Sequence, residues 1–146
     1  MRLQTLIPVI AMLVAGCVTT GDSLRLRANS PAIDDAFRRL SIALTLDGYP
    51  LERTDPVARV VETGWRTFSD SVRASAGAPV PTVVAARIRG TLVPRGRMYD
   101  VFLTIIVREA TASGTVERPV EIHEPLAARW RGVLKGLFVE ELGDED

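Results

Sequence analysis

Two segments in the second half of the chain, residues 82–93 and 98–108, place apolar side chains at every second position. A period of two is typical of β-strands, and the intervening Pro94–Arg97, which contains a glycine, supplies a turn. Together these features predict an antiparallel β-hairpin. Residues 98–108 are apolar on both faces, which indicates a central strand in a sheet.

Amphipathic helices are predicted on both sides of the strand region. The first begins at Ser30-Pro31, where serine suits the N-cap and proline the first helical position, and it ends at Gly48. The second begins at Pro125. Each helix carries one apolar stripe, which predicts that one side packs on a core. The stripes comprise Ile33, Phe37, Leu40 and Leu44 in the first helix, and Leu126, Trp130, Val133, Leu134, Leu137 and Phe138 in the second.

Three further strands are predicted from shorter patterns. Residues 49–54 are expected to form an edge strand, because Pro50 cannot donate a hydrogen bond to a central ladder. Side chains over Arg59–Phe68 alternate between two sides of a predicted strand, and Trp65 is expected on the side that faces the core. Another short edge strand is predicted over residues 115–122.

The segment Ser69–Pro81 is rich in Ser, Ala, Gly and Pro and predicts an exposed loop. No crossover helices separate the predicted strands, so the order α-β-β-β-β-(β)-α indicates an α+β domain with an antiparallel sheet of four to five strands. The N-terminal and C-terminal helices are expected to pack on one face of this sheet.

The first residues of the chain differ in character from the rest. Arg2 is followed by an uncharged stretch with an apolar run at residues 6–15, and then by Gly16-Cys17. At ~1.5 Å per residue such a run reaches about 15 Å as a helix, half of the ~30 Å hydrocarbon core of a bilayer. The segment is too short to span a membrane and is typical of a secretory signal peptide.

The stretch Leu13-Val14-Ala15-Gly16-Cys17 resembles the lipobox of bacterial lipoproteins. The resemblance implies cleavage before Cys17 and its acylation, which would anchor the protein to a membrane. Val18, in place of an aspartate after the cysteine, implies sorting to the outer membrane, with the domain facing the periplasm. A simple signal peptide with an incidental cysteine is the alternative. Cys17 is the only cysteine, so an intramolecular disulfide is excluded.

These features divide the chain into four segments. A signal peptide is expected over residues 1–16, and the lipidated cysteine with a flexible tether over 17–29. A single α+β domain is expected over 30–142, followed by an acidic tail at 143–146.

A second resemblance lies within the predicted domain. Leu46-Asp-Gly-Tyr49, the Asp55-Pro56 turn and Val61-Glu-Thr-Gly-Trp65 together look like the helix-grip domains of BamC-like lipoproteins, which are accessory components of an outer-membrane β-barrel assembly machine. LptE-like lipoproteins, partners of a lipopolysaccharide translocon, similarly place a helix before a sheet and a long helix after it. The single domain departs from the two helix-grip domains of BamC. Both resemblances imply an accessory role in an envelope complex.

Composition and residue pattern exclude several function classes. Eighteen Lys+Arg balance eighteen Asp+Glu, which argues against a general nucleic-acid binder. His123 is the only histidine and lacks the further ligands that a metal site needs, so we expect a polar residue before the last helix. Asp34 and Asp35 are expected to stabilise the start of the first helix rather than to form an acid–base pair. We therefore expect no enzyme activity, no metal and no cofactor.

The remaining candidate is one face of the sheet. Two helices with one stripe each can cover only one face, which leaves the other to water, to the 69–81 loop or to a partner. Arg87 and Arg89 lie two residues apart in a strand and could together bind carboxylates or a phosphate. The predicted partner face comprises Arg66, Arg87, Arg89, Phe102, Thr104 and Ile106.

Two functions are compatible with these observations. The first is a non-enzymatic accessory or scaffold subunit of an envelope complex, anchored to the outer membrane through Cys17 and docked on a protein partner. The second is a lipoprotein that binds lipid or lipopolysaccharide in a pocket between sheet and helices. A cavity above ~300 Å³ under the helices would favour the second function, and a filled core with an exposed apolar sheet face would favour the first.

Overall fold

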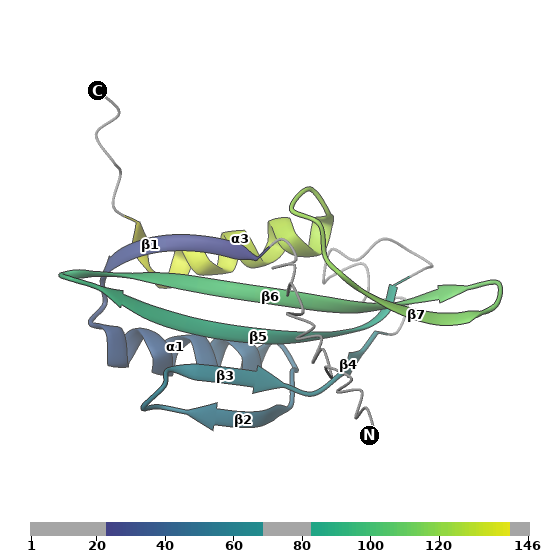
Figure 1. Ribbon diagram of the computed structural model, residues 1–146, viewed down its shortest axis with the longest axis horizontal. Coiled ribbons are helices and arrows are strands. Elements are labelled where there is room, and N and C mark those ends of the chain that lie inside the picture. The colour runs from purple at the N-terminus through teal and green to yellow at the C-terminus, as the bar shows by residue number, and fades with distance from the viewer. Residues whose placement is uncertain (1–22, 69–82, 141–146) are drawn as a thin grey trace, which may run out of the picture.

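The computed structural model describes residues 23–68 and 83–140, which form an α+β fold with one eight-stranded antiparallel sheet and two helices (Figure 1). The predicted fold class is confirmed, although the number and order of the elements differ. The leader with Cys17, the 69–81 loop and the acidic tail lie outside the described residues. The elements are β1 (Leu24–Ser30), α1 (Ile33–Leu46), β2 (Leu51–Asp55), β3 (Val60–Thr63), β4 (Arg66–Thr67), β5 (Val83–Arg95), β6 (Met98–Thr111), β7 (Gly114–Pro119), α3 (Pro125–Leu137) and β8 (Val139–Glu140).

The long hairpin of β5 and β6 forms the centre of the sheet, as its alternation predicts (Figure 1). Its strands pair from Val83 opposite Glu109 to Arg95 opposite Met98. In the turn, Gly96 has a φ of +65°, a left-handed conformation that favours glycine. β3 and β4 pair with β5, while β1 and β7 pair with β6. The predicted edge strand is found as β2, at the end of the sheet beside β3.

The first strand corrects the prediction of a tether that extends to residue 29. β1 pairs antiparallel with β6, from Leu24 opposite Leu103 to Ala28 opposite Tyr99. Leu24, Leu26 and Ala28 are buried and alternate with exposed residues, so this short segment does carry a period of two. The folded domain therefore includes Leu24, and a strand precedes the first helix.

A second correction concerns the strand predicted over residues 59–68. It is divided into β3 and β4 by Gly64 and Trp65, which belong to neither strand. At this break the Thr63 hydroxyl accepts a hydrogen bond from the backbone N–H of Ile88 at 2.9 Å, in the place where a backbone carbonyl would continue the ladder. The break shifts the register, so residues after it project from the opposite sides to those expected.

Both helices pack on the same face of the sheet, behind it in Figure 1. The predicted stripes are confirmed as the core side of each helix, with Leu40, Leu44 and Trp130 among the most deeply buried side chains. The N-cap of α1 is Ala32 without a side-chain hydrogen bond, because the predicted cap, Ser30, belongs to β1.

The sheet approaches α1 closely at one position, Gly90 in β5. A Cβ atom there would lie 2.8 Å from Cδ2 of Leu40 and 3.1 Å from Cγ1 of Val61. The absence of a side chain at Gly90 lets α1 pack closely on the sheet. The core between the helices and the sheet is one continuous cluster of buried side chains.

Candidate functional site

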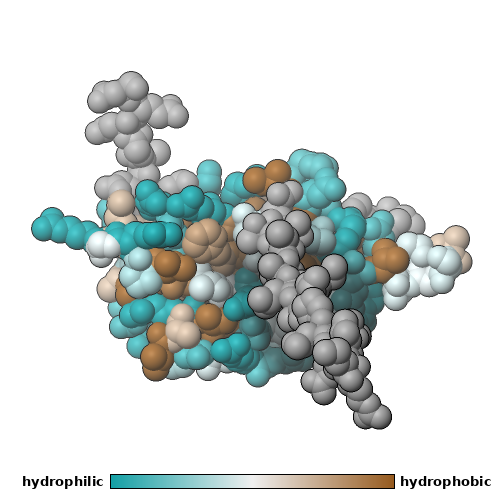
Figure 2. Space-filling view, viewed as in Figure 1, coloured by the Kyte–Doolittle hydropathy of each residue, from teal (hydrophilic) through white to brown (hydrophobic). Residues whose placement is uncertain are grey.

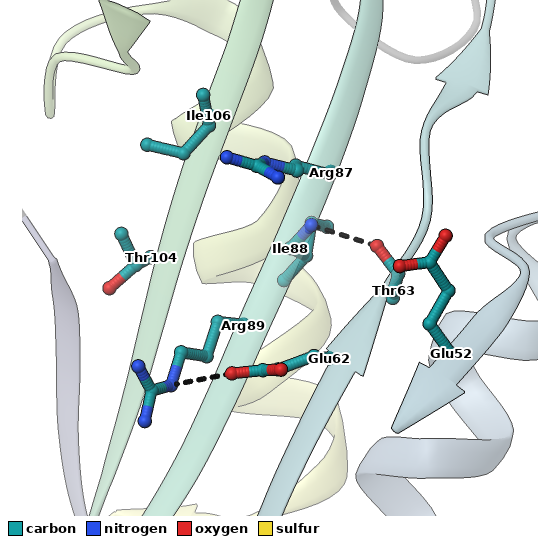
Figure 3. Close-up of a pocket in the computed structure, with 8 residues that line it drawn as sticks. All are labelled: Glu52, Glu62, Thr63, Arg87, Ile88, Arg89, Thr104 and Ile106. Carbon is teal, nitrogen blue, oxygen red and sulfur yellow. Dashed lines mark hydrogen bonds and ion pairs between the residues drawn. The ribbon is translucent and has the colours of Figure 1, made fainter. Parts of the chain in front are cut away.

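We call the side of the sheet that faces away from α1 and α3 the open face. Successive side chains of a strand point to opposite sides, so the residues of β5 and β6 that alternate with the core lie on it. The register places Arg87 opposite Ile106, Arg89 opposite Thr104, and Thr91 opposite Phe102. Figure 3 shows four of the predicted partner-face residues, Arg87, Arg89, Thr104 and Ile106, gathered on this side.

The structure does not place Arg66 with them, which corrects the predicted partner face. β4 sets Arg66 opposite Ala86, a fully buried core residue, so its side chain lies on the helix side of the sheet. There it forms an ion pair with Asp47 at 3.2 Å, and its guanidinium lies over the rings of Tyr49 and Phe68, 5.3 Å from each centroid. Arg66 therefore stabilises the packing between sheet and helices.

Trp65 is the reverse case, a residue expected in the core that instead belongs to the open face. The guanidinium carbons of Arg87 and Arg108 lie 5.0 and 4.1 Å from the centroids of its rings. Such cation–π contacts stabilise by about 0.5–1 kcal/mol each at exposed sites. The partly buried indole holds two arginines of the open face in place.

The open face contains a hollow of about 280 Å³ where the ladder beside β5 is broken. β3 pairs with β5 only as far as Arg89, and β4 resumes pairing at Ala86, so Arg87 and Ile88 lie across a gap. Glu52 and Glu62 lie on one side of the hollow and arginines on the other (Figure 3). Its lining residues are Glu52, Glu62, Thr63, Arg87, Ile88, Arg89, Thr104 and Ile106.

The arginines around this hollow differ in their partners. Arg89 pairs with Glu62 at 3.4 Å, and Arg108 pairs with Glu117 at 3.1 Å. Arg87 is exposed, and within the described residues no carboxylate forms an ion pair with it. Trp65 positions the Arg87 guanidinium, but no described carboxylate neutralises its charge. Of the arginines around the hollow, Arg87 is therefore the best placed to bind an acidic group.

A second group lies at the hairpin end of the open face. We call Arg25, Arg27 and Arg95, together with the carboxylate of Asp100 that they surround, the arginine cluster. Hydrogen bonds from Arg27 lower the pKa of Asp100, burial opposes this effect, and Arg25 adds to it. The sequence contains one signal for this group, a lone aspartate within the apolar strand β6. The Nε or Nη atoms lie 3.0 Å (Arg25), 3.0 Å (Arg27) and 3.3 Å (Arg95) from Asp100 oxygens.

Phe102 lies between the two groups on the open face. It is partly buried, and the guanidinium carbon of Arg25 lies 5.7 Å from its ring centroid. Figure 2, which views the molecule from the open side, shows hydrophilic groups interspersed with separate apolar ones. The open face thus combines arginines with aromatic and aliphatic side chains, a composition typical of binding surfaces.

The structure places His123 away from this face. It is exposed in the segment before α3 and lies 3.2 Å from Glu121. Close by, burial raises the pKa of Glu124, but hydrogen bonds from Arg118 and the backbone outweigh it and lower the pKa overall. Nowhere in residues 23–68 and 83–140 do three or more His, Cys, Asp or Glu side chains meet in a way that could hold a metal ion.

No protein-family model matches the chain, and no curated protein matches it significantly. Among the described elements, neither helix is long and apolar enough to cross a membrane. Fold and site together define an α+β domain in which two helices cover one face of an antiparallel sheet, while the other face carries arginines and partly buried aromatic groups.

Proposed function

We propose that this protein is a non-enzymatic accessory subunit of a bacterial envelope complex, anchored to the outer membrane through Cys17 and facing the periplasm. Its open face docks on a carboxylate-rich surface of a protein partner, with Arg87 at the centre of the contact. The observation that carries the proposal is an arginine that no described carboxylate pairs with, which lies among aromatic and aliphatic side chains on a sheet face that no described helix covers.

The chemistry of the open face favours a protein partner with acidic groups. Arginine and aromatic residues are enriched at the centres of protein interfaces, where arginine forms bidentate hydrogen bonds with carboxylates. Arg87 is held over Trp65, so little side-chain entropy is lost when it binds. Glu52 and Glu62 also line the hollow beside it, so the acidic group of the partner would meet the exposed Arg87 guanidinium, and Ile106 offers apolar contact at the rim.

The alternative function, lipid binding between sheet and helices, gains no support from the packing. Leu40, Leu44, Ile88 and Trp130 fill the space between the layers, and each is at most 2% exposed. They belong to one cluster of contacting side chains that extends from β1 to α3. The filled core is the arrangement that favours docking on a partner.

The anchor would keep the open face near the membrane. β1 begins at Leu24, seven residues after Cys17, and seven extended residues span at most about 25 Å. A partner that binds the open face would therefore also lie at the membrane surface, as expected for a subunit of an envelope complex.

Site-specific photocross-linking in intact cells tests the docking surface. A photoreactive phenylalanine analogue at Thr104, in the hollow, should cross-link one envelope protein at an acid-rich segment, which mass spectrometry identifies. The same analogue at Arg38, on the exposed side of α1, is the positional control. Adding Arg87→Glu should abolish the Thr104 cross-link while the protein stays folded, with a stability loss of about 0.5–1 kcal/mol from the missing contact with Trp65. Equal products from both positions, or a cross-link that survives Arg87→Glu, would contradict the proposal.

The anchor is tested separately by Cys17→Ala. Wild-type protein should be processed before Cys17, carry acyl chains by mass spectrometry and fractionate with the outer membrane. The variant should remain a precursor or become soluble. A variant that is processed and fractionated like the wild type would disprove lipidation.

A further inference from the structure

The arginine cluster is a second site on the open face, distinct from the partner contact at Arg87. Three strands contribute to it, with Arg25 and Arg27 from β1, Arg95 from β5 and Asp100 from β6. Along β5, Arg95 lies eight residues from Arg87, which corresponds to about 26 Å at ~3.3 Å per residue. The two groups adjoin at Phe102, which lies opposite Arg25 and two residues from Thr104 of the hollow, whereas Arg95 marks the far end of the cluster.

The cluster hides its negative charge and exposes its positive charges. The Asp100 side chain is 0% exposed, whereas those of Arg25, Arg27 and Arg95 are 54%, 46% and 58% exposed. Arg27 pairs with this one carboxylate, so the charges of Arg25 and Arg95 make the cluster positive overall. Within the described residues, neither Arg25 nor Arg95 forms an ion pair with any carboxylate besides Asp100. The surface offered to a ligand is therefore cationic.

Asp100 also orients the arginines before any ligand arrives. Each guanidinium directs one edge to the buried carboxylate, at 3.0 to 3.3 Å, so the three groups are fixed around a common point. A guanidinium has five N–H donors, and Asp100 meets only one nitrogen of Arg25 and one of Arg95, which leaves donors of both for a ligand. Fixed, planar donors with excess positive charge match the oxygens of a phosphate group.

The position of the cluster indicates where such a phosphate would come from. Arg25 is eight residues from Cys17, within about 28 Å even for a fully extended chain. If Cys17 is acylated, as the proposed function requires, the bilayer surface lies within reach of the cluster. Phe102, under the Arg25 guanidinium, adds an apolar ring beside the cationic groups, and basic and apolar side chains also occur together in segments that bind the membrane surface.

We propose that the arginine cluster binds the phosphates of anionic phospholipid headgroups in the membrane that anchors the protein. This proposal rests on the proposed function only because it requires that the protein is anchored to a membrane. Binding at the hairpin end would turn the open face toward the bilayer surface and hold Arg87 beside partners that are embedded in it. A single acyl-anchored point cannot set the orientation of a domain, and a second contact can.

Vesicle co-sedimentation tests the proposal without any partner protein. The full chain carries Cys17→Ala, so that acyl chains do not dominate, and its binding to phosphatidylcholine vesicles with phosphatidylglycerol is compared with binding to phosphatidylcholine alone. Contributions from the common leader cancel in comparisons among variants. The test variant is Arg25→Gln/Arg95→Gln, which keeps the Arg27–Asp100 pair. The matched control, Arg38→Gln/Arg39→Gln on α1, removes the same charge from exposed positions away from the open face.

We expect the test variant to lose the preference for anionic vesicles by about 30-fold, because each basic residue at an anionic bilayer contributes about fivefold to partitioning. The control should stay within about twofold. Arg25→Lys/Arg95→Lys, which keeps the charge but not the planar donors, should recover only part of the binding. Circular dichroism establishes that each variant is folded.

Three results would overturn the proposal. Equal losses in test and control variants would show a nonspecific effect of net charge, and an unchanged test variant would show that the cluster does not bind headgroups. Binding of inorganic phosphate to the protein in solution, together with equal sedimentation on vesicles with and without phosphatidylglycerol, would show a site for free phosphate instead. None of these results bears on the Thr104 cross-link, so the two proposals fail independently.

Discussion

Replacing Asp100 by asparagine is the sharpest test of how β1, β5 and β6 are held together at the hairpin end of the sheet. The substitution keeps the shape of the side chain and removes its charge. In the wild type the carboxylate is fully buried and accepts hydrogen bonds from Arg25 and Arg27. The Asp100→Asn variant would have three arginines clustered around a neutral amide, so both the lost attraction and the repulsion among the arginines act against the folded state.

The magnitude follows from burial. Breaking a fully buried ion pair costs about 3–5 kcal/mol. Here the arginines are about half exposed, so water solvates them once the carboxylate is gone, and we expect a loss of ~2 kcal/mol at neutral pH. With a urea m-value of about 2 kcal/mol/M, the midpoint of unfolding should fall by about 1 M.

The effect should depend on pH in a defined direction. The pKa of Asp100 is lowered in the folded protein. Its charge therefore stabilises the fold fully above the unfolded-state pKa, and this contribution is lost as pH falls through the folded-state pKa. The difference between wild type and Asp100→Asn should be largest near pH 7 and shrink below about pH 4.

Urea unfolding followed by circular dichroism, at several pH values, measures both quantities. Glu117→Gln is the control, because Glu117 also pairs with an arginine on the open face but is 48% exposed, and its loss should cost at most about 0.5 kcal/mol. Equal losses in the two variants, or a loss in Asp100→Asn that does not change with pH, would refute the role assigned to the buried carboxylate.

Two further predictions concern the core and use the same urea assay. Leu134→Ala should cost about 2–5 kcal/mol because Leu134 is buried against the sheet, whereas Lys135→Ala, one residue on and exposed, should change stability by at most about 0.5 kcal/mol. Similar effects would contradict the packing of α3. Gly90→Ala should cost about 1–3 kcal/mol, since its Cβ would meet buried Leu40, and an unchanged midpoint would show that Leu40 can move aside.

The sequence alone was sufficient to predict those parts of the fold that depend on a local, periodic pattern of apolar side chains. Two helical stripes and one long alternating hairpin predict an antiparallel α+β sheet with helices on one side. Because side chains alternate strictly along a strand, the same pattern also assigned Arg87, Arg89, Phe102, Thr104 and Ile106 to a common face. What this face binds remains a prediction.

Only the tertiary structure decided what depends on pairing between distant segments. β1 is too short for its alternation to be distinctive, and its partner strand, β6, lies far along the chain, with Leu24 opposite Leu103. The interruption at Gly64 reversed the sides assigned to Trp65 and Arg66, because a shift of one residue in register moves a side chain to the opposite face.

The arginine cluster shows the same limit most clearly. Its members, Arg25, Arg27, Arg95 and Asp100, come from three strands, and no spacing in the sequence relates the first two to the others. In the sequence Asp100 is one polar residue in an apolar strand. It becomes the buried centre of a cationic site because β1 folds against β6 and brings two arginines over it. The local sequence determines which residues share a face of a strand, and long-range pairing determines which charged side chains meet on that face.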